Sequence, residues 1–210
     1  MARQRLVVGY ALVVGILGWI ALLLQFPLHL QGSLAMGNSV GIALLNFFSY
    51  FTILSNILVA LALTVPFLFT NSKSGRFLSN SHVVSGIAVC ITVVGIVYNG
   101  ILRHIWNPQG LQLIVDNLLH TVLPLLFVFY WYLIVPSKTW SWRALCAGAF
   151  FPLGYLGFSL VRGAADGWYP YPFLNADNLG YERALTNSVF VLILFTAIGG
   201  LLWIINRIKP

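Results

Sequence analysis

Two short polar segments inside long apolar stretches carry the side chains that could do chemistry. In VDNLLHTVLP, Asp116 and His120 are four residues apart, which places both on one face of a helix. In SYFTILSN, Ser49, Thr52 and Asn56 follow at steps of three and four, which predicts a second polar helical face. A hydroxyl beside a histidine and a carboxylate is a combination used in general-base and nucleophilic catalysis. Two helices could therefore bring a reactive hydroxyl and a base together.

The depth of these groups also favours a shared site. Asp116 is expected near the outer edge of its stretch and His120 one turn deeper, and Thr52 enters from the same side to a comparable depth. Polar side chains are costly inside a membrane, so several that converge are functional candidates. Pro124 follows four residues after His120 and has no N–H for the carbonyl of that histidine, which predicts a kink beside it.

Further polar residues lie at the predicted outer mouth. Asn99 and Arg103 share one helical face at the end of the third stretch and could hold an anionic group. Arg162 begins the segment RGAADGWYPYPFLN, in which prolines alternate with aromatic residues. This segment is expected to be either a simple loop or a stiff cover over a pocket.

Each of these residues also has a structural explanation. A threonine inside a span, such as Thr52, often bonds a carbonyl of its own helix, and a buried histidine is commonly a packing residue. Asn56 could join two helices. Arg103 and Arg162 could extend only to reach the membrane interface.

Six apolar stretches must position these groups. Each is long enough to cross a hydrocarbon core of about 30 Å, which takes about 20 helical residues. With 60% hydrophobic and 7% charged residues, the chain has too little polar surface for a soluble domain. The first stretch is longer than the apolar region of a cleavable signal peptide, so it is expected to be retained. The sequence predicts an all-α, polytopic membrane protein, one six-helix domain over residues 1–210, with spans at residues 6–26, 43–69, 83–102, 111–135, 142–161 and 185–205.

The charged residues predict an orientation. With both termini in the cytoplasm, eight of the 11 basic residues fall inside and three fall outside, as the positive-inside rule requires. The three external ones are Arg103, Arg162 and Arg183. All four acidic residues then lie on the outer side: Asp116, Asp166, Asp177 and Glu182. The net charge of +7 is explained by this orientation and by anionic membrane lipids, so no nucleic-acid partner is expected.

At SYFTILSN and DNLLHTVLP the chain resembles the androgen-induced-protein family of multi-span membrane hydrolases. Along most of its length it is similar to the short bacterial six-span relatives of that family, of which LVRG and GWYPYPFLN are typical. The resemblance implies a hydrolase of the bacterial cytoplasmic membrane that cleaves fatty-acid esters of hydroxy fatty acids or similar acyl esters, without a cofactor. The loops are shorter than those of the animal members, and the residues around the threonine differ, so the identity of the ester stays open.

The resemblance also implies roles for single residues. The threonine nucleophile of the family falls on Thr52 and its histidine base on His120. Asp116 could fix the tautomer of His120 and stabilise the imidazolium, as a carboxylate does in a serine triad. The candidates to stabilise the oxyanion are Ser55, Asn56 and Asn117. The candidates to bind the substrate are Asn56, Asn99, Arg103, Asn117 and Arg162, with the arginines suited to a lipid carboxylate.

Two other classes of function stay open. A carrier of small amphiphiles would use Asp116 and His120 to relay protons, although neither internal repeats nor broken helices are predicted. A lipid-binding or scaffold protein without turnover is the other class. No metal site is expected, because His29, His82 and His104 are predicted at span ends or in loops. The sequence leaves the oligomeric state open.

Overall fold

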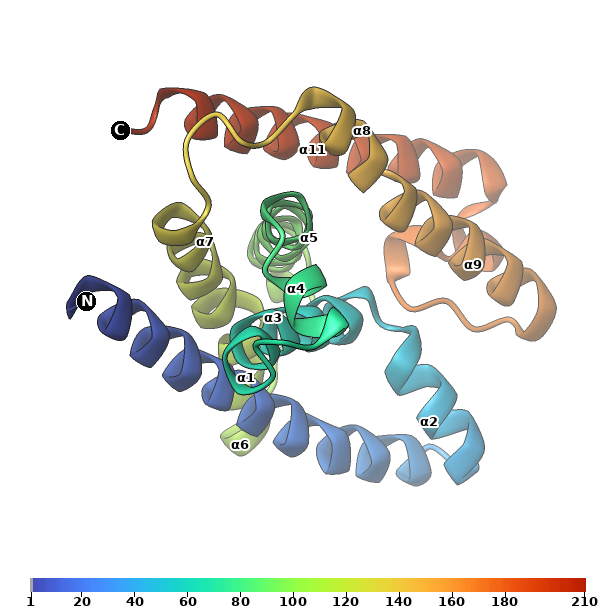
Figure 1. Ribbon diagram of the computed structural model, residues 1–210. Coiled ribbons are helices and arrows are strands. Elements are labelled where there is room, and N and C mark those ends of the chain that lie inside the picture. The colour runs from blue at the N-terminus through green and yellow to red at the C-terminus, as the bar shows by residue number, and fades with distance from the viewer. Residues whose placement is uncertain (1) are drawn as a thin grey trace.

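The computed structural model describes residues 2–210, and over that range the chain forms helices and no β-strand (Figure 1). The elements are α1 (Ala2–Ala35), α2 (Val40–Ser49), α3 (Phe51–Leu68), α4 (Lys73–Leu78), α5 (Ser81–Gly100), η1 (Leu102–His104), α6 (Gly110–Asn117), η2 (Leu118–Val122), α7 (Leu123–Ile134), α8 (Trp142–Gly148), α9 (Phe150–Asp166), η3 (Pro172–Leu174), α10 (Ala176–Leu179) and α11 (Tyr181–Ile208).

Within residues 2–210, six helical stretches are long and apolar enough to cross a membrane. They are Gln4–Ala35, Phe51–Leu68, Ser81–His104, Gly110–Ile134, Trp142–Asp166 and Tyr181–Ile208. The protein is therefore an all-helical, multi-pass membrane protein.

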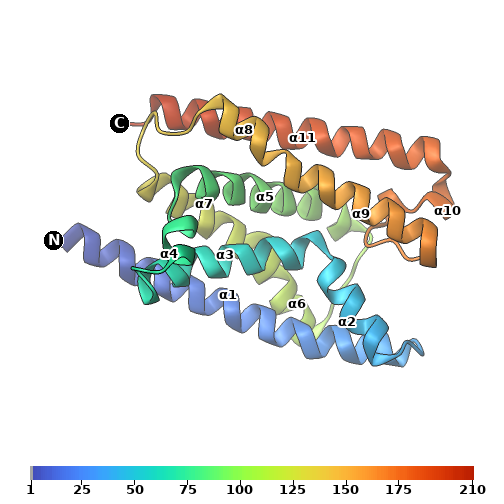
Figure 2. The same cartoon turned by 45° about the vertical axis from the view of Figure 1, so that its right-hand side comes forward.

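The central helix of the bundle is α5. It packs against α3, α7 and α11, while α1 contacts α3, α6 and α7. In both views α1 and α11 lie on opposite sides of the bundle, and α8 and α9 run along α11 (Figures 1 and 2). The two chain ends lie at one end, here called the terminal end, whereas α2 and α10 lie at the other, the distal end (Figure 2).

The first two spans differ from their predicted bounds. α1 continues through Pro27 to Ala35, beyond the predicted end at residue 26. The predicted span 43–69 is two helices, because Tyr50 adopts an extended conformation (φ −78°, ψ 126°) that ends α2 and precedes α3. The expectation that Ser49, Thr52 and Asn56 share one helical face was therefore wrong for Ser49, which belongs to α2.

The break at Tyr50 is stabilised by tyrosine hydroxyls from distant segments. The first amides of α3 have no partner within their own helix. The amide of Phe51 donates to the hydroxyl of Tyr155 (3.2 Å), and the Tyr155 hydroxyl donates to the carbonyl of Ser49 (2.8 Å). The amide of Thr52 donates to the hydroxyl of Tyr171 (3.2 Å). These contacts join residues more than 100 positions apart in the sequence, so no local motif predicts the break.

The fourth span is also irregular, at the place where Pro124 predicts a kink. A π-helix, η2, separates α6 from α7 and contains His120. In this turn the amide of Leu123 bonds the carbonyl of Leu118, five residues earlier. The carbonyl of Leu119 therefore receives no hydrogen bond from the amide of Leu123. Pro124 has no N–H, so it cannot donate to the carbonyl of Leu119 or to that of His120.

At the terminal end, the end of α11 is bound to the connection after α7. The buried side chain of Asn206 accepts from the amide of Trp140 (3.1 Å) and donates to the carbonyl of Pro136 (2.8 Å). The ammonium of Lys209 donates to the carbonyls of Tyr132 (3.2 Å) and Val135, in the last turn of α7, where a cation is favoured.

Removal of the Asn206 amide should weaken this contact. We expect Asn206→Ala to lower the free energy of unfolding by about 1–3 kcal/mol, because it leaves a buried N–H and a carbonyl without partners. Thermal unfolding in detergent, followed by circular dichroism, measures the change. The matched control is Thr196→Ala on the exposed face of α11, where the hydroxyl bonds only the carbonyl of Leu192. Equal melting temperatures for the two variants would contradict the assignment.

Candidate functional site

A cavity of about 470 Å³ lies between α1, α3, α5, the α6–η2 segment and the chain after α9. Thr52, Asp116 and His120 all line it. The segment 167–175, here called the proline-aromatic segment, contributes Pro170, Tyr171 and Pro172 to the wall, whereas the preceding residues 162–166 belong to α9. The three candidate catalytic residues of the sequence analysis thus meet in one cavity.

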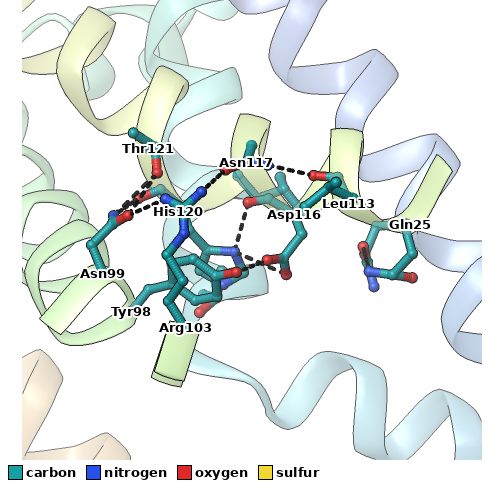
Figure 3. A network of polar contacts seen from close by, with 12 residues as sticks. Gln25, Tyr98, Asn99, Arg103, Leu113, Asp116, Asn117, His120 and Thr121 are labelled. Atoms are coloured by element: carbon teal, nitrogen blue, oxygen red, sulfur yellow. Dashed lines mark hydrogen bonds and ion pairs between the residues drawn. The ribbon is translucent and has the colours of Figure 1, made fainter. Parts of the chain in front are cut away.

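The imidazole of His120 is held through one of its nitrogens (Figure 3). Nδ1 lies 2.8 Å from the backbone oxygen of Asp116 and 3.4 Å from its carboxylate Oδ1. Both neighbours are acceptors, so Nδ1 carries the proton in the neutral ring and Nε2 keeps its lone pair. The i, i+4 spacing that pairs these residues in the sequence is the source of this geometry.

Tyr98 of α5 completes the group and was missed in the sequence. Its ring stacks on that of His120 with centroids 4.0 Å apart and planes 17° apart. Its hydroxyl donates to Oδ2 of Asp116. One aromatic side chain therefore fixes both the plane of the imidazole and the rotamer of the carboxylate. Tyr98 occupies this position because of the way α5 is rotated relative to α6. That rotation is a property of the tertiary packing, which the local sequence does not show.

Two asparagine side chains bind the carbonyls that η2 leaves free. The amide nitrogen of Asn56 donates to the carbonyls of Leu119 (3.1 Å) and Thr52 (2.9 Å). The amide nitrogen of Asn99 donates to the carbonyl of His120 (3.2 Å). Asn56 is fully buried and does not line the cavity. It joins the segment that carries Thr52 to the segment that carries His120.

A glycine permits the close packing of α5 on η2. A Cβ added at Gly95 would lie 3.3 Å from the carbonyl oxygen of His120 and 3.3 Å from Cβ of Pro124. Both distances are tighter than ordinary van der Waals contact, so a larger side chain would separate the helices. Asn99, one turn further along α5, is thereby brought within reach of the same carbonyl.

The hydroxyl of Thr52 lies 3.3 Å from the hydroxyl of Tyr171, and the threonine is 7% exposed. Over residues 2–210 no direct hydrogen bond joins Thr52 to His120, although both line the same cavity. No local pattern in the sequence singles out Tyr171 as a functional residue. Its burial raises the pKa of the phenol, so the group is a neutral hydroxyl over the physiological range.

The polar residues that the sequence predicts at the outer mouth form two groups, neither of which contains a residue of the cavity wall. Arg103 donates to the side-chain oxygens of Asn99 (2.8 Å) and Asn117 (3.0 Å), as Figure 3 shows. Arg162 is 8% exposed and donates to Ser49 Oγ (2.5 Å), to Asp166 Oδ2 (3.1 Å) and to Asn46 Oδ1. Neither arginine lines the cavity.

The geometry also bears on the oxyanion candidates. Ser55, Asn56 and Asn117 do not line the cavity. Asn117 instead donates to the carbonyl of Leu113 (2.8 Å) and accepts from Arg103. As the side chains stand, none of the three faces an ester held at Thr52.

His29 lies within α1, because that helix extends to Ala35. It lines the same cavity as His120, and its Nε2 lies 3.1 Å from the carbonyl oxygen of Ala43. His29 therefore belongs to the last turns of the first span and not to a loop. Even so, among the described residues no group of three or more His, Cys, Asp or Glu side chains could hold a metal ion.

A second, smaller cavity of about 70 Å³ begins on the other side of Thr52 and Tyr171. Its lining is almost entirely apolar, with contributions from α3, α5, α9 and α11. Residues that line both cavities are Thr52, Tyr98, Leu102 and Tyr171. Thr52 thus lines both the larger cavity, which carries several polar side chains, and the smaller, almost entirely apolar one.

Comparisons of the chain with protein-family models, with curated proteins and with solved structures find no match.

The bridge made by Asn56 can be tested by stability. We expect Asn56→Leu to lower the free energy of unfolding by about 1–3 kcal/mol, because the carbonyl of Leu119 loses its partner. In a Pro124→Ala background the loss should be smaller, since the restored N–H at position 124 can bond a freed carbonyl. Unfolding in detergent measures both, as a double-mutant cycle.

The adjacent Ser55→Ala is the control for this cycle. The hydroxyl of Ser55 is buried, and within the described chain it has no hydrogen-bond partner. Its loss should therefore leave stability nearly unchanged. If Asn56→Leu behaves like Ser55→Ala, the bridge does not stabilise the fold.

Proposed function

We propose that this chain is an intramembrane lipid-ester hydrolase with Thr52 as the nucleophile, His120 as the general base and Asp116 as the group that orients the histidine. One observation carries the proposal. The three side chains line one cavity in which Nδ1 of His120 is held by Asp116 and Nε2 is left free to accept a proton. Substrates are proposed to be fatty-acid esters of hydroxy fatty acids or similar acyl esters, as the family resemblance implies.

In the proposed reaction, Nε2 of His120 takes the hydroxyl proton of Thr52 as Oγ1 attacks the ester carbonyl carbon. The π electrons of the carbonyl move to its oxygen. When the tetrahedral intermediate collapses, the C–O bond to the alcohol breaks and the alcohol leaves with the proton held by His120. Water then releases the acyl group from Thr52 by the same steps. Asp116 stabilises the imidazolium that forms in each half of the reaction.

The two cavities support a division of the substrate at Thr52. The larger one has polar side chains and a volume suited to the alcohol part of the ester, whereas the smaller one is apolar and suits the start of an acyl chain. Thr52 lines both of them. Catalytic contacts often tighten only when substrate is bound, which is compatible with the lack of a direct hydrogen bond between Thr52 and His120 among the described residues.

The setting of the reaction is part of the proposal. Six spans, both chain ends at one end of the bundle and the excess of basic residues support a topology with both termini in the cytoplasm and the cavity in the outer half of the membrane. The membrane would be the bacterial cytoplasmic membrane. Partners would be acyl-ester substrate and membrane lipids, with no nucleic acid.

The break at Tyr50 favours a second candidate, a carrier of small amphiphiles. The sequence predicts unbroken helices, which would count against a carrier, yet a break at Tyr50 separates α2 from α3 beside the cavity. Broken helices are typical of carrier binding sites. Reconstitution in lipid vesicles separates the candidates: movement of a fatty-acid analogue without ester cleavage supports a carrier. Binding with neither transport nor cleavage supports a lipid-binding protein.

Loss of either member of the proposed pair should abolish hydrolysis. We expect Thr52→Ala and His120→Ala each to reduce kcat to background, because nucleophile and base act as one unit. Thr52→Ser should keep part of the rate. An ester-cleavage assay on the purified protein measures kcat, and a fluorophosphonate lipid probe measures covalent labelling of Thr52.

Two variants control for general damage to the fold. Thr64→Ala removes a buried threonine hydroxyl from the same helix, where it bonds the carbonyl of Ala60 (2.7 Å). His82→Ala removes an exposed histidine at the start of α5. Both should keep the wild-type rate. Wild-type turnover by pure Thr52→Ala would remove this threonine as nucleophile.

Filling the apolar cavity should shorten the acyl chain that is accepted. Val94→Phe and Leu192→Phe narrow it from α5 and from α11. We expect kcat/KM for a palmitate ester, relative to a butyrate ester, to fall about tenfold or more, since each methylene that a pocket rejects is worth about 1–3 kcal/mol. Ile193→Phe, on the exposed face of α11, is the control. An unchanged chain-length preference would exclude this cavity as the acyl site.

A further inference from the structure

The hydroxyl of Tyr171 lies against both polar atoms of Thr52 that an ester would meet. It is 3.3 Å from the side-chain Oγ1 and 3.2 Å from the backbone nitrogen, whose N–H it accepts. Oγ1 and the carbonyl oxygen become neighbours on one carbon when a tetrahedral intermediate forms. A hydroxyl that already lies within hydrogen-bond distance of Oγ1 is therefore close to the place where negative charge develops.

The position of Tyr171 is fixed by its surroundings. It lies between Pro170 and Pro172, which restrict the backbone on either side. Its ring stacks on that of Phe173, with centroids 5.2 Å apart and planes 3° apart, and meets the ring of Tyr50 edge-on at 6.0 Å. A hydroxyl held this way needs little reorganisation to donate to a new acceptor.

The start of the same segment is attached to the bundle by a second set of contacts. The guanidinium of Arg162 lies 4.2 Å from the ring centre of Trp168, and Trp168 meets Tyr50 edge-on at 5.5 Å. Further along, the amide of Asn187 donates to the carbonyl of Phe173 (3.0 Å). The segment is thus attached on both sides of Tyr171, through α9 and through α11.

We propose that the hydroxyl of Tyr171, together with the backbone N–H of Thr52, stabilises the oxyanion in the hydrolysis reaction. This inference rests on the proposed function. As Oγ1 of Thr52 bonds to the ester carbon and its proton passes to His120, the carbonyl π electrons move to oxygen. That oxygen replaces the Tyr171 oxygen as acceptor for the Thr52 N–H, and the Tyr171 O–H donates to it.

No candidate from the sequence competes for this role. Ser55, Asn56 and Asn117 lie outside the cavity wall. Tyr155, the other tyrosine at the start of α3, accepts from the amide of Phe51 and donates to the carbonyl of Ser49. Tyr171 is the tyrosine whose hydroxyl reaches the side chain of Thr52.

Tyr171→Phe tests the proposal, because it keeps the ring and removes the hydroxyl. We expect kcat to fall about 10²–10³-fold, as for other lost oxyanion donors, with KM changed less than about threefold. Affinity for an alkyl boronic acid, which forms a tetrahedral adduct on the threonine hydroxyl, should fall in parallel with kcat/KM. Affinity for the product fatty acid should not change. Tyr169→Phe, in the same segment but outside the cavity wall, is the control and should keep wild-type values.

Several outcomes would overturn the inference. A wild-type kcat in Tyr171→Phe excludes the hydroxyl as oxyanion donor, and a raised KM with unchanged kcat reduces Tyr171 to a cover over the cavity. If Tyr171→Phe unfolds, a fluorinated tyrosine at position 171 keeps the shape and makes the hydroxyl more acidic, so boronate affinity should change while product affinity does not. A wild-type protein that neither cleaves esters nor binds boronate would exclude the proposed function itself. An active wild-type protein with a fully active Tyr171→Phe variant would exclude only the role of the Tyr171 hydroxyl.

Discussion

The lack of an N–H on Pro124 is the constraint on which the arrangement of the cavity depends. In hydrocarbon a free backbone carbonyl has no water to bond, so neighbouring helices must supply donors. Asn56 from α3 and Asn99 from α5 do so, at the carbonyls of Leu119 and His120. The need to supply hydrogen-bond donors to these two carbonyls therefore determines how α3 and α5 pack against the helical segment that contains His120. Because Asn56 also bonds the carbonyl of Thr52, the same interaction relates the candidate nucleophile to the candidate base.

The same rule operates at the start of α3, with donors and acceptors exchanged. There the helix is interrupted and its first amides need acceptors, which the hydroxyls of Tyr155 and Tyr171 provide. Each irregularity is satisfied by side chains from other helices or from the proline-aromatic segment, and each lies beside the cavity. An uninterrupted α-helix satisfies its own backbone groups and would have needed none of these side chains as hydrogen-bond partners. The polar residues around the cavity are thus, in large part, the partners of an irregular backbone.

Most of the fold follows from the sequence, and much of the site does not. Six apolar stretches and the i, i+4 pair of Asp116 and His120 are local patterns, and Pro124 marks the irregular turn. No proline or glycine marks the break at Tyr50 in the sequence. The hydroxyls that stabilise it come from residues more than 100 positions away, so no local pattern predicts it. Tyr98 and Tyr171 are likewise selected by the packing of α5 and of the proline-aromatic segment. Neither tyrosine lies three or four residues from Thr52 or His120 in the sequence, so no helical spacing connects them.

The rigidity of the polar groups bears on the choice between chemistry and transport. A carrier needs polar groups that exchange partners as the bundle opens to either side. Here the imidazole of His120 is stacked on Tyr98 and bonded to Asp116, and Asp116 is in turn bonded to Tyr98. Stabilisation of a transition state benefits from groups fixed before substrate arrives, because no reorganisation is then needed during the reaction. The break at Tyr50 is also held on both of its sides by tyrosine hydroxyls. A broken helix that is fixed in this way is more consistent with the proposed hydrolase than with a carrier, which must open a path.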